Sequence, residues 1–158
     1  MLKQTGVPDR SQIKDAFPDE SYLIKPKAII ECFEKIPCNP CETSCPVGAI
    51  AIGDDINNIP VIDHAICTGC GQCVHNCPGL AVHIVSFKAD KALFRIPYEM
   101  PDIPKKGDIW DGIGRDGKKI CEATIKGIVQ KEEFDKTTIL NVETDKTYLY
   151  DVITVRRP

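Results

Sequence analysis

The sequence predicts an α+β protein in which a cysteine-rich module is followed by a small antiparallel β module. Eight of the nine cysteines lie between Cys32 and Cys77, so one segment is chemically specialised. That segment contains two similar cysteine runs, whereas the residues after Lys88 form β-prone runs separated by turn residues. The expected units are an extended N-terminal arm over residues 1–27, the cysteine module over 28–88, and a small β-barrel or sandwich over 89–158.

The first 27 residues predict an extended arm. They are rich in polar residues and are interrupted by Pro8, Pro18 and Pro26. The stretch AFPDESYLIKP shows neither the 3.6-residue period of an amphipathic helix nor the two-residue alternation of a strand. The opening residues also lack the apolar core of an export signal, so we expect reduced cysteines and a cytoplasmic location.

The cysteine module repeats its own pattern. The runs CNPCETSCPVGAIAI (38–52) and CGQCVHNCPGLAVHI (70–84) each contain a Cys-Pro step, a small turn and an apolar strand. The β-prone run AIIECF (28–33) leads into the first copy, and GAIAIGDDINNIPVID (48–63) predicts a hairpin between the copies. Two copies at such short range predict a unit with pseudo-twofold symmetry.

The second cysteine group has a spacing that is typical of iron–sulfur ligation. Cys67, Cys70, Cys73 and Cys77-Pro78 form the C-x-x-C-x-x-C-x-x-x-C-P run of proteins with two 4Fe–4S clusters. Spacings of three allow successive thiolates to cover one face of a cubane, and the fourth cysteine of the run ligates the other cluster. The spacing therefore predicts two clusters that exchange a ligand.

The first cysteine group departs from this pattern. Cys38, Cys41 and Cys45-Pro46 match its last part, but the position three residues before Cys38 is Lys35. Cys32 is the nearest replacement, and the alternatives are a three-iron form or ligation by the distant Cys121. The preferred sets are Cys32, Cys38, Cys41 and Cys77 for the first cluster, and Cys45, Cys67, Cys70 and Cys73 for the second.

Zinc is a rival for the same thiols, because C-x-x-C pairs also bind zinc. A zinc site needs only four ligands, however, and does not require the two Cys-Pro steps. On this interpretation the chain would be a structural interaction module and not a redox protein.

The two runs ending in CPVGAIAI and CPGLAVHI resemble the two-cluster bacterial-type ferredoxin family over about residues 28 to 86. More narrowly, ECFEKIPCNPCETSCPVGAI together with GDIWDGIGRDGKKICEATIKGIV is similar to small iron–sulfur subunits of multi-subunit flavin-dependent amino-acid or amine dehydrogenases of the proline type. The resemblance implies a ferredoxin-like domain that passes single electrons between a flavoprotein partner and an acceptor within a hetero-oligomer. A freely diffusing ferredoxin is the alternative, although it would need neither the arm nor the β module.

The C-terminal module predicts strands with short turns between them. Turn residues recur about every dozen residues, in PDIPKKG, GRDG, KEEFDK and TDK. The expected strands are ALFRIPYEM (92–100), GDIWDGI (107–113), KKICEATIKGIVQ (118–130), TTILNVET (137–144) and YLYDVITVRR (148–157).

Several other signals are better explained by structure than by function. Gly112, Gly114 and Gly117 fit G-x-G-x-x-G, but a strand-like run follows them, so we expect a hairpin and no nucleotide site. His64, His75 and His83 are expected to be surface or strand histidines, and Cys121 a small buried side chain. No nucleophile with a neighbouring base stands out, so the sequence predicts no catalytic residue in this chain.

The overall charge excludes one class of partner. The formal net charge is −3 and the cationic residues are scattered in short pairs, so no basic stripe is available for nucleic acid. No apolar run reaches the roughly 18 residues that a transmembrane helix needs.

Overall fold

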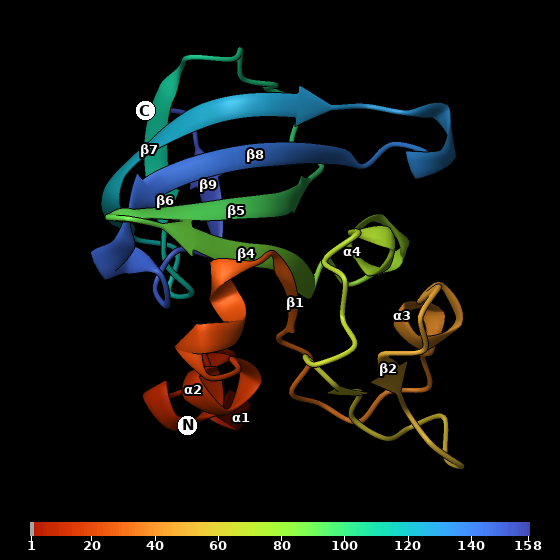
Figure 1. Ribbon diagram of the computed structural model, residues 1–158. Helices are drawn as coiled ribbons and strands as arrows, with labels where there is room; N and C mark the ends of the chain where they lie inside the picture. The colour runs from red at the N-terminus through yellow and green to blue at the C-terminus, as the bar shows by residue number, and fades with distance from the viewer. Residues whose placement is uncertain (1) are drawn as a thin grey trace.

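The computed structural model describes residues 2–158 and contains two antiparallel sheets (Figure 1). The large sheet has seven strands in the order β1-β4-β5-β8-β7-β6-β9, and the small one pairs β2 with β3. The strands of the large sheet are β1 (Lys27–Ile30), β4 (Val82–Lys88), β5 (Lys91–Tyr98), β6 (Ile109–Ile113), β7 (Lys119–Val129), β8 (Thr138–Asp145) and β9 (Thr154–Arg156). Those of the small sheet are β2 (Ile50–Ala51) and β3 (Val61–Ile62).

The helical elements are all short. They are the α-helices α1 (Leu2–Thr5), α2 (Arg10–Ala16), α3 (Pro40–Thr43) and α4 (Gln72–Asn76), and the 3₁₀ turns η1 (Glu20–Ile24), η2 (Glu132–Phe134) and η3 (Lys146–Tyr148). Across residues 2–158, no helix has the length and apolar character that crossing a membrane requires.

The prediction of an extended N-terminal arm is wrong, because α1, α2 and η1 occupy most of it. Helix α2 begins with a capping box, in which the Asp9 side chain accepts from the backbone of Gln12 and the Gln12 side chain accepts from the backbone of Asp9. Ile13, Phe17 and Leu23 are buried in the core of the large sheet. Burial of each of these side chains stabilises the fold by about 1.5–3 kcal/mol, which favours a packed segment over a solvated one.

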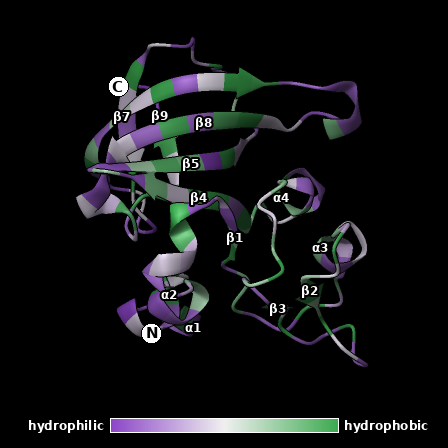
Figure 2. Cartoon of the chain, in the orientation of Figure 1, coloured by the Kyte–Doolittle hydropathy of each residue, from purple (hydrophilic) through white to green (hydrophobic). Residues whose placement is uncertain are grey.

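The large sheet curls on itself, so that β6 and β9 lie behind β4 and β5 in Figure 1. Tyr98 on β5 and Trp110 on β6 are separated in the sheet by two strands, yet their rings pack edge to face with centroids 6.1 Å apart. Apolar and polar residues alternate along β7 and β8 (Figure 2), as expected for strands with one face on a core.

The sheet crosses the predicted boundary between the cysteine module and the β module. Strands β1 and β4 belong to the former, and β4 continues into β5 through a tight hairpin. Both faces of these strands are covered: Ile29 and Val85 enter the main core, whereas Ala28 and Ile84 enter a second core beneath the cysteines. The cysteine module is therefore built onto the edge of the large sheet.

The predicted strands of the β module mostly form, with one clear difference. The segment 148–157 was expected to be a single strand, but only Thr154–Arg156 pairs, with β6, and 3₁₀ structure precedes it. The glycine-rich segment forms the hairpin between β6 and β7, where the Gly117 N–H donates to the Gly114 carbonyl. Strand β7 follows this turn, so the hairpin predicted for the three glycines is confirmed.

Candidate metal centre

Two neighbouring helical turns carry one cysteine from each group. Cys41 lies in α3 and Cys73 lies in α4, and the two helices are beside one another (Figure 1). Each helix is followed by a Cys-Pro step that ends its turn and directs the chain toward a strand. The two sequence repeats thus have corresponding local structures.

The first set of thiols surrounds an open cavity. Cys32, Cys38, Cys41 and Cys77 all line a space of about 380 Å³, and apolar side chains such as Ile36 form other parts of its wall. Cys77 comes from the second repeat and joins three cysteines from the first. This is the grouping that ligand exchange between the repeats predicts, while the ligation of iron by each thiol stays a prediction.

The second set surrounds a smaller cavity on the sheet side. Cys45, Cys67, Cys70 and Cys73 line it together with apolar residues of the second core. Cys67 and Cys73 are buried, whereas Cys70 is exposed. Cys45 is the reciprocal of Cys77, because it comes from the first repeat and joins three cysteines of the second.

Backbone N–H groups are directed at several of the sulfurs. The Ala49 N–H donates to Cys45 Sγ at 3.2 Å, and the Ala81 N–H donates to Cys77 Sγ at 3.3 Å. In both repeats the donor lies four residues after the cysteine. Such bonds favour a sulfur that carries negative charge, as a thiolate bound to iron does.

Burial opposes ionisation of the free thiols. It raises the pKa of Cys32 and of Cys41, and burial together with neighbouring Cys67 and Cys70 raises the pKa of Cys73 to about 12. Burial therefore favours protonated thiols in the metal-free chain, and binding of metal to the thiolates releases protons. Apart from Cys70, the thiols of both sets are partly or fully buried, and this burial with N–H donors beside several sulfurs fits iron–sulfur clusters.

Cys121 belongs to neither set. It lies on β7, packs against the main core and sits beside Gly112, where an added Cβ would collide with its sulfur. No three His, Cys, Asp or Glu side chains in residues 2–158 converge closely enough to hold a single metal ion. The cysteine thiols instead line the walls of the two cavities.

Two cations contact the loop that carries the second set. Lys27 is buried, and its Nζ donates to the Cys67 carbonyl at 2.6 Å. The Arg95 guanidinium donates to the Gly69 carbonyl from β5. Gly69 has a positive φ of 67° and packs on the Pro26 carbonyl, which leaves no room for a Cβ. Sequence reasoning missed both cations, because each contact joins residues far apart in the chain.

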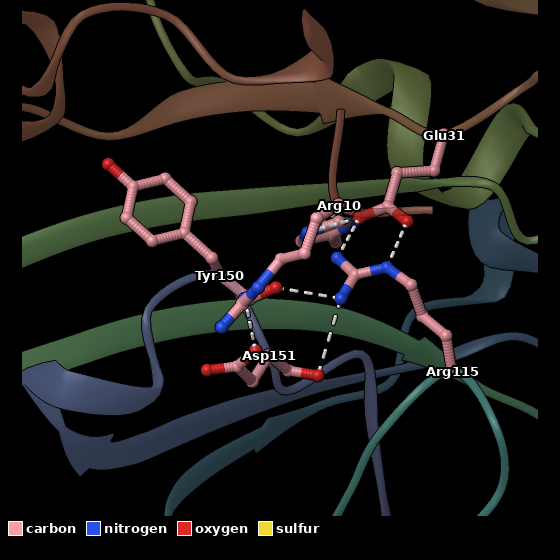
Figure 3. Close-up of polar contacts among 6 residues, drawn as sticks. Arg10, Glu31, Arg115, Tyr150 and Asp151 are labelled. Atoms are coloured by element: carbon pink, nitrogen blue, oxygen red, sulfur yellow. Dashed lines mark hydrogen bonds and ion pairs between the residues drawn. The ribbon is translucent and has the colours of Figure 1, made fainter. Parts of the chain in front are cut away.

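A buried ion pair connects the first set to the β module (Figure 3). Glu31, directly before Cys32, accepts two hydrogen bonds from Arg115, one of them from Nε at 2.6 Å. Arg115 lies in the turn between β6 and β7, and its Nη1 also donates to the Tyr150 carbonyl at 2.7 Å. The side chains of both partners are under a tenth exposed.

The three histidines occupy different environments. His64 Nε2 lies 3.0 Å from the Ala28 carbonyl oxygen, and His75 stacks on Phe134 with ring centroids 4.1 Å apart. His83 is on strand β4 but is fully buried, next to the Glu31 carboxylate. Surface or strand positions were expected for all three, and the burial of His83 was not foreseen.

Comparison with known proteins identifies the chemistry of this segment. Residues 36–81 match the family model of the 4Fe-4S dicluster domain. Most of the cysteine module is therefore similar to this dicluster domain. It binds two 4Fe–4S clusters, which confirms the cofactor predicted from the spacing.

Three relatives illustrate how this domain is used elsewhere. The chain is 47% identical over 38 residues to a subunit of the Na(+)-translocating ferredoxin:NAD(+) oxidoreductase complex of Acetobacterium woodii, which is 24% of this chain and 11% of that protein. It is 30% identical over 59 residues to the ferredoxin-type protein NapF of Haemophilus influenzae, covering 36% of the chain and 34% of the relative. It is 32% identical over 87 residues to protein NrfC of Escherichia coli, covering 54% of the chain and 37% of the relative.

The matched segments thus span between about a tenth and just over a third of the relatives' own lengths. No solved structure is significantly similar to the chain.

Proposed function

We propose that this chain is the electron-transfer subunit of an oxidoreductase complex, in which its dicluster domain passes single electrons between a flavoprotein partner and an acceptor. The observation that carries the proposal is the pair of four-thiol cavities built on adjacent helical turns. A 4Fe–4S cluster supplies reversible one-electron chemistry, and two of them allow a two-electron donor such as a flavin to be emptied in single steps. The chain has no catalytic role of its own in this proposal.

The arrangement of the protein around the thiols supports transfer of electrons between partners. Cys70 is exposed and the cavity of the first set is open, so a partner can approach both sets. Cys45 and Cys77 each line the cavity of the other cysteine group. This exchange supports a ferredoxin-like arrangement of the domain. The named relatives include a subunit of an oxidoreductase complex and a ferredoxin-type protein.

Exposed apolar side chains favour a docked subunit over a freely diffusing ferredoxin. Val61 is 70% exposed, and most other large apolar side chains left exposed in residues 2–158 also belong to the cysteine module. They are Ile36, Val47, Ile56, Ile59, Ile66 and Leu80. Burial against a partner would remove these side chains from water, which supports docking through the cysteine module.

Anaerobic purification of the chain with its native partners tests the proposal. We expect about eight irons and eight sulfides per chain, and a flavin-containing chain in the same complex. Stoichiometric zinc, or about four irons per chain, would contradict the dicluster assignment. A monomer that carries both clusters and exchanges electrons in solution would instead favour the free ferredoxin.

A further inference from the structure

Two cations that lack a carboxylate partner contact the loop that carries the second thiol set. Lys27 is 8% exposed, which is rare for lysine, and it contacts the Cys67 carbonyl. Arg95 is half-buried and contacts the Gly69 carbonyl, beside Cys70. Within the part of the chain that the structure describes, neither cation forms an ion pair with Asp or Glu. Their positive charges are therefore not neutralised locally.

The charges at the first thiol set have the opposite sign. Glu31 and Glu34 both line its cavity, and no lysine or arginine does so. Glu31 is neutralised by Arg115 through the buried pair, but Glu34 forms no ion pair among residues 2–158. Glu34 follows Cys32 by two residues, and the Cys32 sulfur lies 4.0 Å from the Glu34 carbonyl oxygen. The two sets thus differ in the sign of the unpaired charge that lines the cavity or contacts its loop.

This difference matters because reduction adds one negative charge to a cluster. A nearby cation stabilises the reduced form, whereas a nearby anion destabilises it, and burial strengthens the effect of Lys27 and Arg95. Lys27 is shielded from solvent, and Arg95 stays protonated at any relevant pH. The charges of the protein therefore favour an electron at the second set.

We propose that Lys27 and Arg95 raise the reduction potential at the second thiol set above that at the first. Electrons then run downhill from the set of Cys32, Cys38, Cys41 and Cys77 to the set of Cys45, Cys67, Cys70 and Cys73. The donor faces the first set and the acceptor faces the second. This inference rests on the proposed electron-transfer function and adds the direction of flow.

A redox titration of the full-length, anaerobically purified chain tests the order. Electron paramagnetic resonance follows both signals, and Cys38→Ser and Cys70→Ser assign them to the first and second sets. We expect the second set to be reduced at the higher potential. Arg95→Gln should make its reduction about tenfold less favourable, which corresponds to about 59 mV for one electron.

Matched variants separate charge from structure. Arg95→Lys keeps the positive charge and should keep the potential of the second set. Lys118→Gln removes an exposed cation in the β6–β7 turn and should shift neither potential. Should Arg95→Gln fail to retain iron, Lys27→Gln should lower the potential of the second set, and the exposed Glu34→Gln should raise that of the first.

The outcomes distinguish this inference from the proposed function. A first set that titrates at the higher potential, or charge-removing variants that leave both potentials unchanged, would overturn the inference alone. Reversible reduction at neither set would overturn the electron-transfer function together with it.

Discussion

Cys32 lies six residues before Cys38, whereas the corresponding cysteines of the second group, Cys67 and Cys70, are three apart. The longer step carries the chain from the end of β1 around to α3 and still places Cys32 on the wall of the first cavity. Lys35, at the position that the regular spacing reserves for a ligand, does not line that cavity. The irregular spacing is thus compatible with a complete four-thiol set.

Replacement of Cys32 tests this ligand set. Cys32→Ala should lose the first cluster or convert it to a three-iron form, because the cavity then holds only three thiols. Iron analysis and low-temperature electron paramagnetic resonance measure the change, and the second cluster should be intact. Cys121→Ala is the matched control, since Cys121 packs on the main core. Loss of iron in Cys121→Ala with none in Cys32→Ala would show that the assigned set is wrong.

His83 is expected to make stability depend on pH. Its ring is 2% exposed, and Nε2 has no hydrogen-bond partner among the described residues. Burial lowers the pKa of His83 to about 4, with a smaller opposing effect from Glu31. Between this pKa and the unfolded value of about 6.5, the unfolded chain binds a proton that the folded chain does not. Stability should therefore fall as the pH falls through this window.

The size of this effect can be isolated with His83→Phe. On going from about pH 7 to pH 5, the wild-type chain should lose roughly 2 kcal/mol more of its unfolding free energy than the variant. Denaturant unfolding at both pH values, on samples with equal iron content, measures the difference. Equal losses in the two proteins would mean that the pKa of His83 does not differ between the folded and unfolded chains, which would contradict the prediction.

At the scale of elements, local chemistry made some parts of the fold predictable. The hairpin of β6 and β7 was predictable because Gly114 to Gly117 supply turn residues between two β-prone runs. The helix α2 was missed although its capping box, Asp9 to Gln12, was readable, because three prolines dominated the interpretation of the segment. Short helices of this kind depend on tertiary burial more than on their own periodicity.

For the candidate site, the grouping of the thiols was predictable from the sequence, but the groups around them were not. The spacing of the cysteines indicates which thiols can share a cavity. Three ligands of each set are close in sequence, and the cysteine of each Cys-Pro step joins the other set. The groups that surround the thiols are not encoded in this way. Arg115 reaches Glu31 across 84 positions and Arg95 reaches Gly69 across 26, and no local pattern reports such contacts.

The Glu31–Arg115 pair connects the end of β1 with the β6–β7 turn, and its loss should destabilise the fold. Arg115→Gln would leave the Glu31 carboxylate buried without a charged partner, at a cost of about 3–5 kcal/mol. Chemical denaturation measures this cost. Arg10→Gln is the matched control, because Arg10 pairs with Asp151 at the surface and such pairs contribute about 0–1 kcal/mol.

A double variant separates the buried charge from the shape of the side chain. Glu31→Gln combined with Arg115→Gln removes both charges and should recover part of the lost stability. If Arg115→Gln is no more harmful than Arg10→Gln, the pair does not hold the two elements together. Iron content should be measured in each variant, since Glu31 directly precedes Cys32.

At the scale of the whole molecule, one sheet joins what the sequence divides into two modules. The boundary expected near Lys88 falls in the tight β4–β5 hairpin, where the strands pair along most of their length. The division followed the change in composition, which reports where cysteines are concentrated but not where strands find partners. The two modules differ in composition, but their strands belong to one sheet.

A fragment of residues 1–88 should therefore fail to fold and to retain iron. It would expose the free edge of β4 and the faces of Ile29 and Val85, which are fully buried in the main core, because the β module supplies most of that core. Residues of β1 and β4 also pack in the second core, together with Cys67 and Cys73. Unfolding of these strands should therefore disorder the two cysteines as well. Circular dichroism and iron analysis of the fragment, reconstituted in parallel with the full chain, measure both consequences.

An insertion provides the control for disruption of the chain as such. Two glycines placed after Asp135, in the exposed turn before β8, should leave the iron content and the cooperative unfolding of the full chain unchanged. A 1–88 fragment that binds about eight irons and unfolds cooperatively would show that the dicluster domain folds alone. The sheet would then be a docking surface between two independent units, and the burial of Ile29 and Val85 would reflect their association and not a shared core.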